Sequence, residues 1–400
     1  MHINLTPRRE LLLLLSLAGI QFTHIVDFMI MMPLGPQLTE LFGISLAEFG
    51  LLVSAYTVAA GMSGLFATTF VDRFDRRRLL LVLYVMFALT TVACGVAPTY
   101  SWLMVARIAS GFFGGVLNTM SQTIIGDVIP FARRGRATGI VMTSFSVASV
   151  AGVPAGLLFA NLWGWHFAFF GIGLLCLSVG ILTYYSVPQL NAHVVHAKDK
   201  HIFHAMGQVL LEPNHRLALM LSATMMFAAF TIIPYITLYL QTNHVLTPSE
   251  IPWIYFCGGV VTLFSGRWVG GVTDRLGKRQ TFQRAVLFST LPMFAVTLLE
   301  PVPLPWVLLA TSILFFAMNA RMIPGMALLT SAANPKYRGT FLSLNGAVQS
   351  FAMGVAAWIG GLLLQREPSG HVTYYWLCAV VAAAASLLAY QLAKKIEMHQ

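Results

Sequence analysis

The chain has 400 residues, of which 57% are hydrophobic and only 10% are charged, and its formal net charge is +10. An ordinary soluble domain carries about a quarter charged residues, so this composition excludes one. The basic residues fall in short segments between apolar blocks. We therefore attribute the positive charge to membrane topology and expect no nucleic-acid partner.

The apolar residues form repeated blocks of about twenty, the length of a helix that crosses the hydrocarbon core of a lipid bilayer. The first block runs on into a full span rather than to a small-residue cleavage site, so we expect no cleaved signal peptide. The pattern predicts an all-α membrane protein with twelve transmembrane helices. In chain order the spans are expected at 11–34, 46–70, 79–98, 101–126, 137–160, 165–187, 216–241, 250–272, 282–300, 304–331, 339–364 and 372–393.

The distribution of Lys and Arg predicts the orientation of these spans. If the N-terminus is cytoplasmic, nearly all basic residues lie in cytoplasmic loops, and Arg366 alone lies in an outer loop. Loops rich in Lys and Arg stay on the cytoplasmic side of a membrane. We expect both termini to be cytoplasmic and the protein to be a multi-pass component of a bacterial-type inner membrane.

Two short motifs occur twice with nearly the same offset. The sequence DRFDRR at 72–77 returns as DRLGKR at 274–279, and the Arg-Gly pair at 134–135 returns at 338–339. Repeats of this kind, each after an equivalent span, indicate that the second six helices duplicate the first. The sequence therefore predicts two pseudo-symmetric six-helix bundles around a central pathway.

The longest loop divides the predicted spans six and six. We expect an N-terminal bundle at 1–187, a cytoplasmic linker at 188–215 and a C-terminal bundle at 216–400. The linker histidines and the four cysteines show no spacing typical of a metal site or of a disulfide framework, so we expect neither metal nor cofactor. The linker histidines considered are His193, His196, His201 and His204.

Few ionisable residues lie deep in a predicted span, where a charge costs at least a few kcal/mol. Asp27 is the carboxylate farthest from a span end, and Arg107 and Arg321 are the deep cations. Gln21, His24 and Asp27 are spaced by three and share one face of the first helix. We expect Asp27, His24 and Arg107 to couple transport to protons. The alternative is a static ion pair of Asp27 with Arg321 or Arg107.

Further polar and aromatic residues lie within the apolar spans and can line a substrate cavity. Helix-to-helix hydrogen bonding and ordinary packing are the alternatives for each of them. Pro234 predicts a kink in the seventh span. The candidate cavity residues are Gln21, Asn118, Gln122, Phe230, Tyr235, Tyr239, Asn319, Arg321, Asn345 and Gln349.

The charged loops that follow the second and eighth spans contain residues of both signs. Ion pairs of this kind can stabilise one conformation and break in another. A purely topological role is the alternative. The predicted conformational latch consists of Asp72, Arg73, Arg76, Asp127, Asp274 and Arg275.

These loops resemble the signature of the major facilitator superfamily, a glycine followed by DRxGRR, and the resemblance covers the whole chain. In the first half Thr68 and Asp75 replace the expected glycines. The second half matches the signature through Gly270, Asp274, Arg275, Gly277, Lys278 and Arg279.

Two further motifs resemble the drug:proton antiporter and sugar-efflux branch of this family. The RxxxGxxxG element is matched by Arg107, Gly111 and Gly115, and the helix-packing element of exporters by Gly152, Pro154 and Gly156. His166 stands where that branch usually has an arginine. The resemblance implies close helix packing at these positions and a role of the arginine in proton coupling.

The resemblance also implies a monomeric secondary transporter that works by alternating access. We expect it to export a small organic molecule, such as a drug, sugar or metabolite, in exchange for protons. An amphiphile or lysolipid carrier and an organic-anion uptake transporter are the alternatives. An enzyme is not expected, because no nucleophile, base or metal cluster accompanies Asp27 and His24 at membrane depth.

Overall fold

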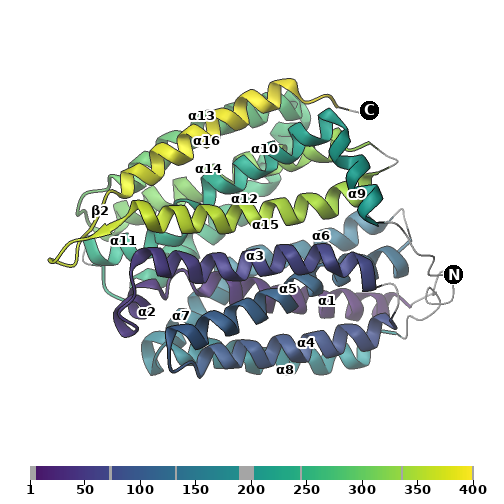
Figure 1. The fold of residues 1–400 in the computed structure, drawn as a ribbon, viewed down its shortest axis with the longest axis horizontal. Helices are drawn as coiled ribbons and strands as arrows, with labels where there is room; N and C mark the ends of the chain where they lie inside the picture. Colours follow the sequence, from purple (N-terminus) through teal and green to yellow (C-terminus); the bar gives the residue numbers. More distant parts are fainter. Residues whose placement is uncertain are drawn as a thin grey trace. The chain divides into compact units, whose positions relative to one another are not determined.

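The structure is a computed structural model that describes residues 6–71, 74–130, 133–188, 202–243, 246–334 and 337–398, with only the backbone described at 68–70 and 202–205 (Figure 1). Its first half contains α1 (Pro7–Ile30), α2 (Gly35–Leu41), α3 (Leu46–Phe70), α4 (Arg76–Gly95), α5 (Tyr100–Val128), α6 (Arg134–Val147), the π-helical turn η3 (Ala148–Gly152), α7 (Val153–Trp163) and α8 (His166–Ser186).

The second half contains the remaining helices and one short hairpin. The helices are α9 (Ile202–Leu211), α10 (Pro213–Phe230), the 3₁₀ turn η5 (Ile233–Tyr235), α11 (Ile236–Asn243), α12 (Ile251–Leu276), α13 (Lys278–Thr297), α14 (Leu304–Ala332), α15 (Arg338–Leu363) and α16 (Tyr375–Lys395). The strands β1 (Gln365–Arg366) and β2 (Val372–Thr373) pair in antiparallel register before α16.

Ten helical segments of the described residues are long and apolar enough to cross a membrane. The segments α12 and α13 are not among them, although helices form at both positions where spans are predicted. Between them these two helices carry several basic residues, including Arg267, Arg275 and Arg284. The all-helical membrane fold is confirmed, while the count of twelve spans stays a prediction.

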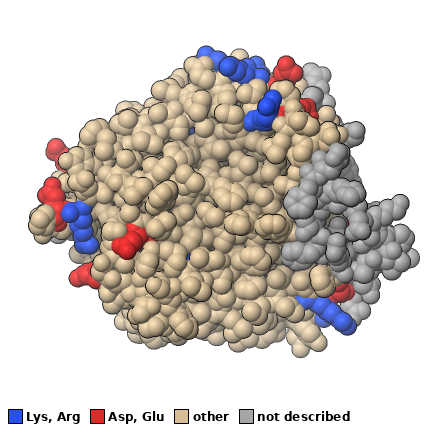
Figure 2. Space-filling model, viewed as in Figure 1, with Lys and Arg blue, Asp and Glu red and all other residues tan. Residues whose placement is uncertain are grey.

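The surface agrees with a lipid-facing protein. Large apolar side chains are exposed on many helices, with Phe264 at 73% and Leu291 at 72% of full exposure. On the face drawn in Figure 2, charged side chains are few and wide areas carry none. Apolar surface of this extent is stable in hydrocarbon and not in water.

The first predicted span ends earlier than expected. A helix was predicted over 11–34, but α1 ends at Ile30 and a turn leads into α2. Pro33 lacks a backbone N–H, and a proline disfavours the helical conformation of the residue before it. The same physical rule is confirmed at Pro234, where α10 and α11 are separated by the 3₁₀ turn η5.

A second interruption was not predicted. The span expected at 137–160 is broken by the π-helical turn η3, directly before α7. Pro154 lies in the first turn of α7, where its missing N–H leaves a carbonyl one turn earlier without its usual donor. A single wide turn accommodates this loss and redirects the helix axis.

The two signature loops use different residues to start the next helix. Gly277 adopts a φ of 86°, a conformation that only glycine reaches easily, and separates α12 from α13. Asp75 occupies the corresponding place before α4 with an ordinary φ of −59°, and its side chain accepts a hydrogen bond from the backbone N–H of Arg78. Asp75 is therefore a helix N-cap, which explains why a glycine is not needed there.

The chain forms two compact units. Unit 1 comprises Met1–Ile30 and Ala59–His201, and unit 2 comprises Met31–Val58 and Ile202–Gln400, so the division falls within α3. This grouping by contacts does not test the predicted sequence boundaries of the two bundles. Part of the predicted linker is helical in α9, and residues 189–201 of it, with three of its histidines, lie outside the described residues.

Helices inside each unit pack according to the same scheme. In unit 1, α1 contacts α5, α6 and α8, and α4 contacts α5 and α8; in unit 2, α10 contacts α14, α15 and α16, and α13 contacts α14 and α16. The helix bounds follow the repeat as well, because Tyr100 and Leu304 are 204 positions apart, as are Val128 and Ala332. Equivalent helices thus have equivalent neighbours, as expected for a duplicated bundle.

Candidate functional site

A buried ion pair lies inside unit 1. Arg107 Nη1 on α5 is 3.0 Å from Asp27 Oδ2 on α1, and both side chains are completely buried. The same nitrogen donates a second hydrogen bond, of 3.1 Å, to the carbonyl oxygen of Asp27. The partner of Asp27, which the sequence left open between two arginines, is Arg107. A buried pair of this kind is costly to break, because either partner alone is a charge without compensation.

The environment of this pair is only partly polar. The hydroxyl of Thr91 on α4 lies near the carboxylate, but Asp27 Oδ1 accepts no hydrogen bond of ordinary geometry from the described residues. His24 lies one turn earlier on α1, with its ring 6.2 Å from that of Phe87. A carboxylate with one open acceptor position can take up a proton without losing existing hydrogen bonds at that oxygen.

A neutral polar pair joins the same two helices. Gln21 Nε2 donates a hydrogen bond to Asn118 Oδ1 over 2.8 Å, which is a second polar connection between α1 and α5. Gln21 is buried, whereas Asn118 and Gln122 are exposed. The predicted common face of Asn118 and Gln122 on α5 is therefore present, and one of its two amides is already engaged between helices.

Arg321 is the buried cation of unit 2, and its partners are neutral. Its guanidinium donates to Ser386 Oγ and to the Met225 carbonyl oxygen, each over 3.1 Å. No carboxylate of the described residues lies within ion-pair distance of it. The sequence analysis did not select Ser386, and the signal that could have found it is that it is the single serine or threonine of α16.

The other predicted polar residues of unit 2 are largely used between helices. Gln349 Nε2 donates to Ser222 Oγ over 2.9 Å. The Asn319 amide donates to the Thr262 carbonyl and to Ser265 Oγ, which joins α14 to α12. Asn345 is buried, and its Oδ1 has no hydrogen-bond partner among the described residues.

The three aromatic residues predicted to line the substrate cavity do not form one surface. Phe230 is half-buried at the end of α10. Tyr235 is fully buried, and its hydroxyl donates to the Ala357 carbonyl oxygen. Tyr239 donates to the Leu299 carbonyl over 3.3 Å and lines a separate cavity described below. The hydrogen bond of Tyr235 to a carbonyl more than a hundred residues away indicates a role in helix packing, which the sequence around Pro234 does not predict.

One ion pair of the predicted latch is present in unit 1. Arg76 at the start of α4 pairs with Asp127 at the end of α5. Arg76 is almost buried, while Asp127 is about one-third exposed (36%). In the second half, Asp274 and Arg275 are exposed and form no ion pair within the described ranges. Asp72 and Arg73 lie outside the described residues.

The predicted packing glycines allow close helix contacts. A Cβ on Gly115 would overlap the Ala60 carbonyl oxygen of α3. A Cβ on Gly152 would overlap Val26, and one on Gly156 would lie 2.8 Å from Ile30 Cδ1, so both glycines hold the α6–α7 segment against α1. Gly111 is buried on α5. A glycine at these positions brings two backbones together, which is typical of membrane helices.

The described residues contain no group of three or more His, Cys, Asp or Glu side chains that could hold a metal ion. Asp27 and Arg107, with the neighbouring pair of Gln21 and Asn118, form a polar cluster that joins α1 and α5. Its chemistry is limited to binding and releasing a proton or an ion, because the cluster contains no nucleophile paired with a base.

Comparisons with known proteins show the family of this chain. The Major Facilitator Superfamily profile matches residues 17–357 and 219–398. The chain is similar to the uncharacterized MFS-type transporter YbcL of Bacillus subtilis, with 25% identity over 88% of this chain and 89% of YbcL. It is also similar to the inner membrane transport protein YdhP of Escherichia coli K12, with 23% identity over 91% of this chain and 92% of YdhP.

Solved structures share the fold at lower identity. A D-xylose-proton symporter superposes with a TM-score of 0.78 at 17% identity, covering 96% of this chain and 97% of the symporter. A bacterial homolog of the human lysosomal transporter Spinster, in an inward-facing and occupied conformation, gives 0.77 at 16% identity and 98% coverage of both chains. The chain therefore belongs to the Major Facilitator Superfamily and is a multi-pass membrane transporter rather than an enzyme.

Proposed function

We propose that this transporter exports a small organic molecule, such as a drug, sugar or metabolite, in exchange for protons. The proposal places it in the drug:proton antiporter and sugar-efflux branch, as a monomer in a bacterial-type inner membrane. The observation that carries it is the fully buried pair of Asp27 and Arg107, joined over 3.0 Å. Buried charges inside membrane helices are costly and are usually retained for function.

The pair offers a simple coupling step. Protonation of Asp27 removes the negative charge and leaves Arg107 without its counter-ion. An uncompensated buried cation is destabilising by several kcal/mol, so the protonated protein favours any conformation that solvates Arg107 or gives it another anion. Release of the proton restores the pair and the first conformation. His24, one turn away on α1, is the proposed relay for this proton.

Two likenesses support the proposal. One relative, YdhP, is named an inner membrane transport protein. One structure with the same fold is named a D-xylose-proton symporter, so this fold carries proton coupling in at least one protein. The predicted latch residues Arg76 and Asp127 would then pair and separate during the cycle.

The test uses the purified full chain in liposomes that contain a pH-sensitive dye. A panel of organic cations, neutral sugars and organic anions is offered with and without a pH gradient. Wild type should move protons only with the compounds that it carries. Asp27→Asn should abolish uphill accumulation and proton flux while keeping the exchange of labelled for unlabelled compound, because exchange needs no net proton transfer.

Thr23→Val is the matched control, since Thr23 is a buried polar residue of the same helix that bonds to Tyr84 rather than to the ion pair. It should keep coupled transport. Uphill accumulation that survives in Asp27→Asn would refute the coupling role and leave the pair as a structural element.

A second candidate function is uptake of an organic anion. It is favoured by Arg321, a buried cation whose described partners are a hydroxyl and a carbonyl oxygen. A substrate carboxylate or phosphate would supply the missing negative charge. In the same liposomes this function predicts that anions alone are carried and that Arg321→Gln loses their transport, whereas organic cations and sugars give no flux.

A further inference from the structure

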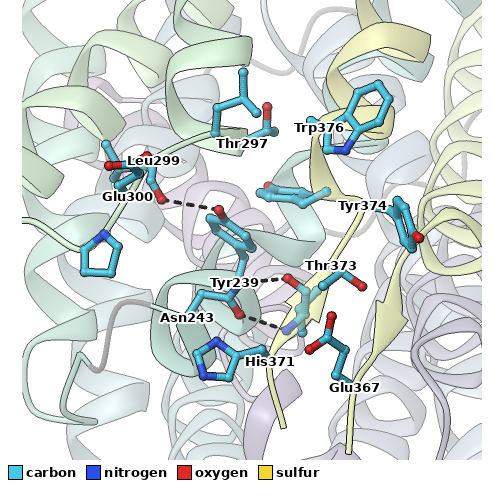
Figure 3. A pocket seen from close by; sticks show the side chains of 14 residues that line it. Tyr239, Asn243, Thr297, Leu299, Glu300, Glu367, His371, Thr373, Tyr374 and Trp376 are labelled. Atoms are coloured by element: carbon cyan, nitrogen blue, oxygen red, sulfur yellow. Dashed lines mark hydrogen bonds between the residues drawn. The ribbon is translucent and has the colours of Figure 1, made fainter. Parts of the chain in front are cut away.

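A cavity of about 640 Å³ opens at one end of unit 2, away from the buried arginine. It is an open cavity lined by residues of α11, the loop between α13 and α14, the β1–β2 hairpin and the first turn of α16 (Figure 3). The distribution of basic residues predicts that this end is extracytoplasmic. Of the candidate site residues named above, only Tyr239 lines this cavity.

Hydrogen bonds hold the walls of this cavity in place. The Asn243 side chain donates to the Val372 carbonyl over 2.7 Å and accepts from the Val372 N–H over 2.9 Å. The end of α11 is therefore hydrogen-bonded to both backbone polar groups of one hairpin residue. Tyr239 donates to Leu299 in the opposite loop. Tyr375 packs on Tyr239 with 4.7 Å between ring centroids. The cavity is therefore a built feature rather than a gap between mobile loops.

The charge of the lining is negative. Its lining contains two exposed carboxylates, Glu300 and Glu367, together with His371, and it contains no Lys or Arg. Figure 3 shows these two carboxylates on opposite sides of Tyr239. Tyr374 and Trp376 add further aromatic surface. Tyr374, the residue before α16, adopts a left-handed φ of 64°, which is uncommon for a residue with a bulky side chain.

We propose that this cavity binds organic ammonium ions from the extracytoplasmic side. Two carboxylates attract a cation, and the faces of tyrosine and tryptophan rings stabilise an alkylated ammonium that is weakly hydrated. An anion would be repelled by both glutamates. A divalent metal fits less well, because the described residues supply no group of three ligating side chains here.

This site is independent of the proposed proton-coupled export, because its residues lie in unit 2 and the coupling pair lies in unit 1. Binding can therefore be measured without any transport. Asp27→Asn, which should abolish coupling, should leave binding in the cavity unchanged. Failure of one proposal does not imply failure of the other.

The experiment is calorimetric titration of the purified full chain with choline and with its neutral tert-butyl analogue, which has the same shape but no charge. Wild type should bind choline at least about tenfold more tightly than the analogue, and this ratio is the charge selectivity. The double variant Glu300→Gln with Glu367→Gln should lose at least about tenfold in choline affinity. Trp376→Ala should weaken binding while keeping both carboxylates.

Glu40→Gln is the matched control, since Glu40 is an exposed glutamate of α2 in the same unit and does not line the cavity. It should bind choline as wild type does. The proposal is overturned if choline and its analogue bind equally, if the double variant retains wild-type affinity, or if wild type releases no heat with choline at concentrations on the order of 10 mM.

Discussion

Arg107 on α5 holds Asp27 on α1 in an ion pair of 3.0 Å in which neither side chain is exposed. Eighty residues separate the two in sequence, so the pair is a tertiary feature that joins two helices of unit 1. Arg321 of unit 2 is equally buried but has neutral described partners. Substitution by methionine is therefore expected to have opposite effects on stability at the two buried arginines.

Loss of either partner of the ion pair should destabilise the protein more than loss of both. Arg107→Met leaves a buried carboxylate without its cation and should lower the free energy of unfolding by about 3–5 kcal/mol. The double variant Asp27→Leu with Arg107→Met should recover a large part of this loss. Unfolding in increasing SDS measures the free energy of unfolding of the detergent-purified wild type, the single variants and the double variant. Equal costs for the single and double variants would contradict the buried pairing.

Arg321→Met should have the opposite effect on stability. The substitution removes a buried charge that has no carboxylate partner, so the unfolding free energy should stay within about 1 kcal/mol of wild type or rise. Ser386 remains satisfied because its hydroxyl also donates to the Ala382 carbonyl over 2.7 Å. The same SDS titration tests this. A loss as large as that of Arg107→Met would show that Arg321 has a stabilising counter-charge.

Gly115 and Gly126 are a matched pair on α5. A Cβ on Gly115 would overlap the Ala60 backbone, so Gly115→Ala should force α3 and α5 apart and cost about 1–3 kcal/mol. Gly126 has no neighbouring heavy atom within 4 Å of such a Cβ. Gly126→Ala should therefore leave stability unchanged or raise it by up to about 1 kcal/mol through helix propensity. Thermal unfolding followed by circular dichroism compares them, and similar effects of the two substitutions would argue against a close α3–α5 contact.

The Arg76–Asp127 pair should behave as a charge pair that tolerates reversal. Asp127→Arg alone places two cations together and should destabilise unit 1, whereas Asp127→Arg with Arg76→Asp should restore part of the loss. Because Asp127 is about one-third exposed (36%), the coupling energy should be only about 1–2 kcal/mol. A double-mutant cycle measures it. Arg78→Ala, at an exposed neighbouring arginine, serves as the control, and a coupling energy near zero would remove Arg76 and Asp127 from the latch.

The sequence located the helices well because hydropathy and helix breakers act over short distances. Pro234 predicted the break between α10 and α11, and the duplicated motifs predicted equivalent packing, which the helix contacts of the two units follow. Two other breaks were not predicted. The helix α1 ends before Pro33, inside a span that was expected to be continuous. The π-helical turn before Pro154 was not expected either, because a continuous apolar pattern does not distinguish a wide turn from a regular one.

The candidate site was predicted as a set of residues rather than as an arrangement. Spacing by three placed Gln21, His24 and Asp27 on one face of α1, which is local information. Which arginine pairs with Asp27 depends on how helices far apart in sequence pack, and spacing contains no information about that. The same limit applies to Tyr235, which was predicted to line the substrate cavity and whose hydroxyl donates a hydrogen bond to the Ala357 carbonyl.

Local sequence pattern was enough to identify a helical membrane protein with a duplicated architecture, because the lengths of the apolar blocks and the positions of charge follow directly from the energetics of the bilayer. Helix packing was needed to show that Asp27 pairs with Arg107, that Arg321 bonds to neutral groups, and that four separate segments line an acidic aromatic cavity. Each of these depends on side chains that meet from distant parts of the chain, and such meetings are fixed by helix packing and loop geometry rather than by local pattern.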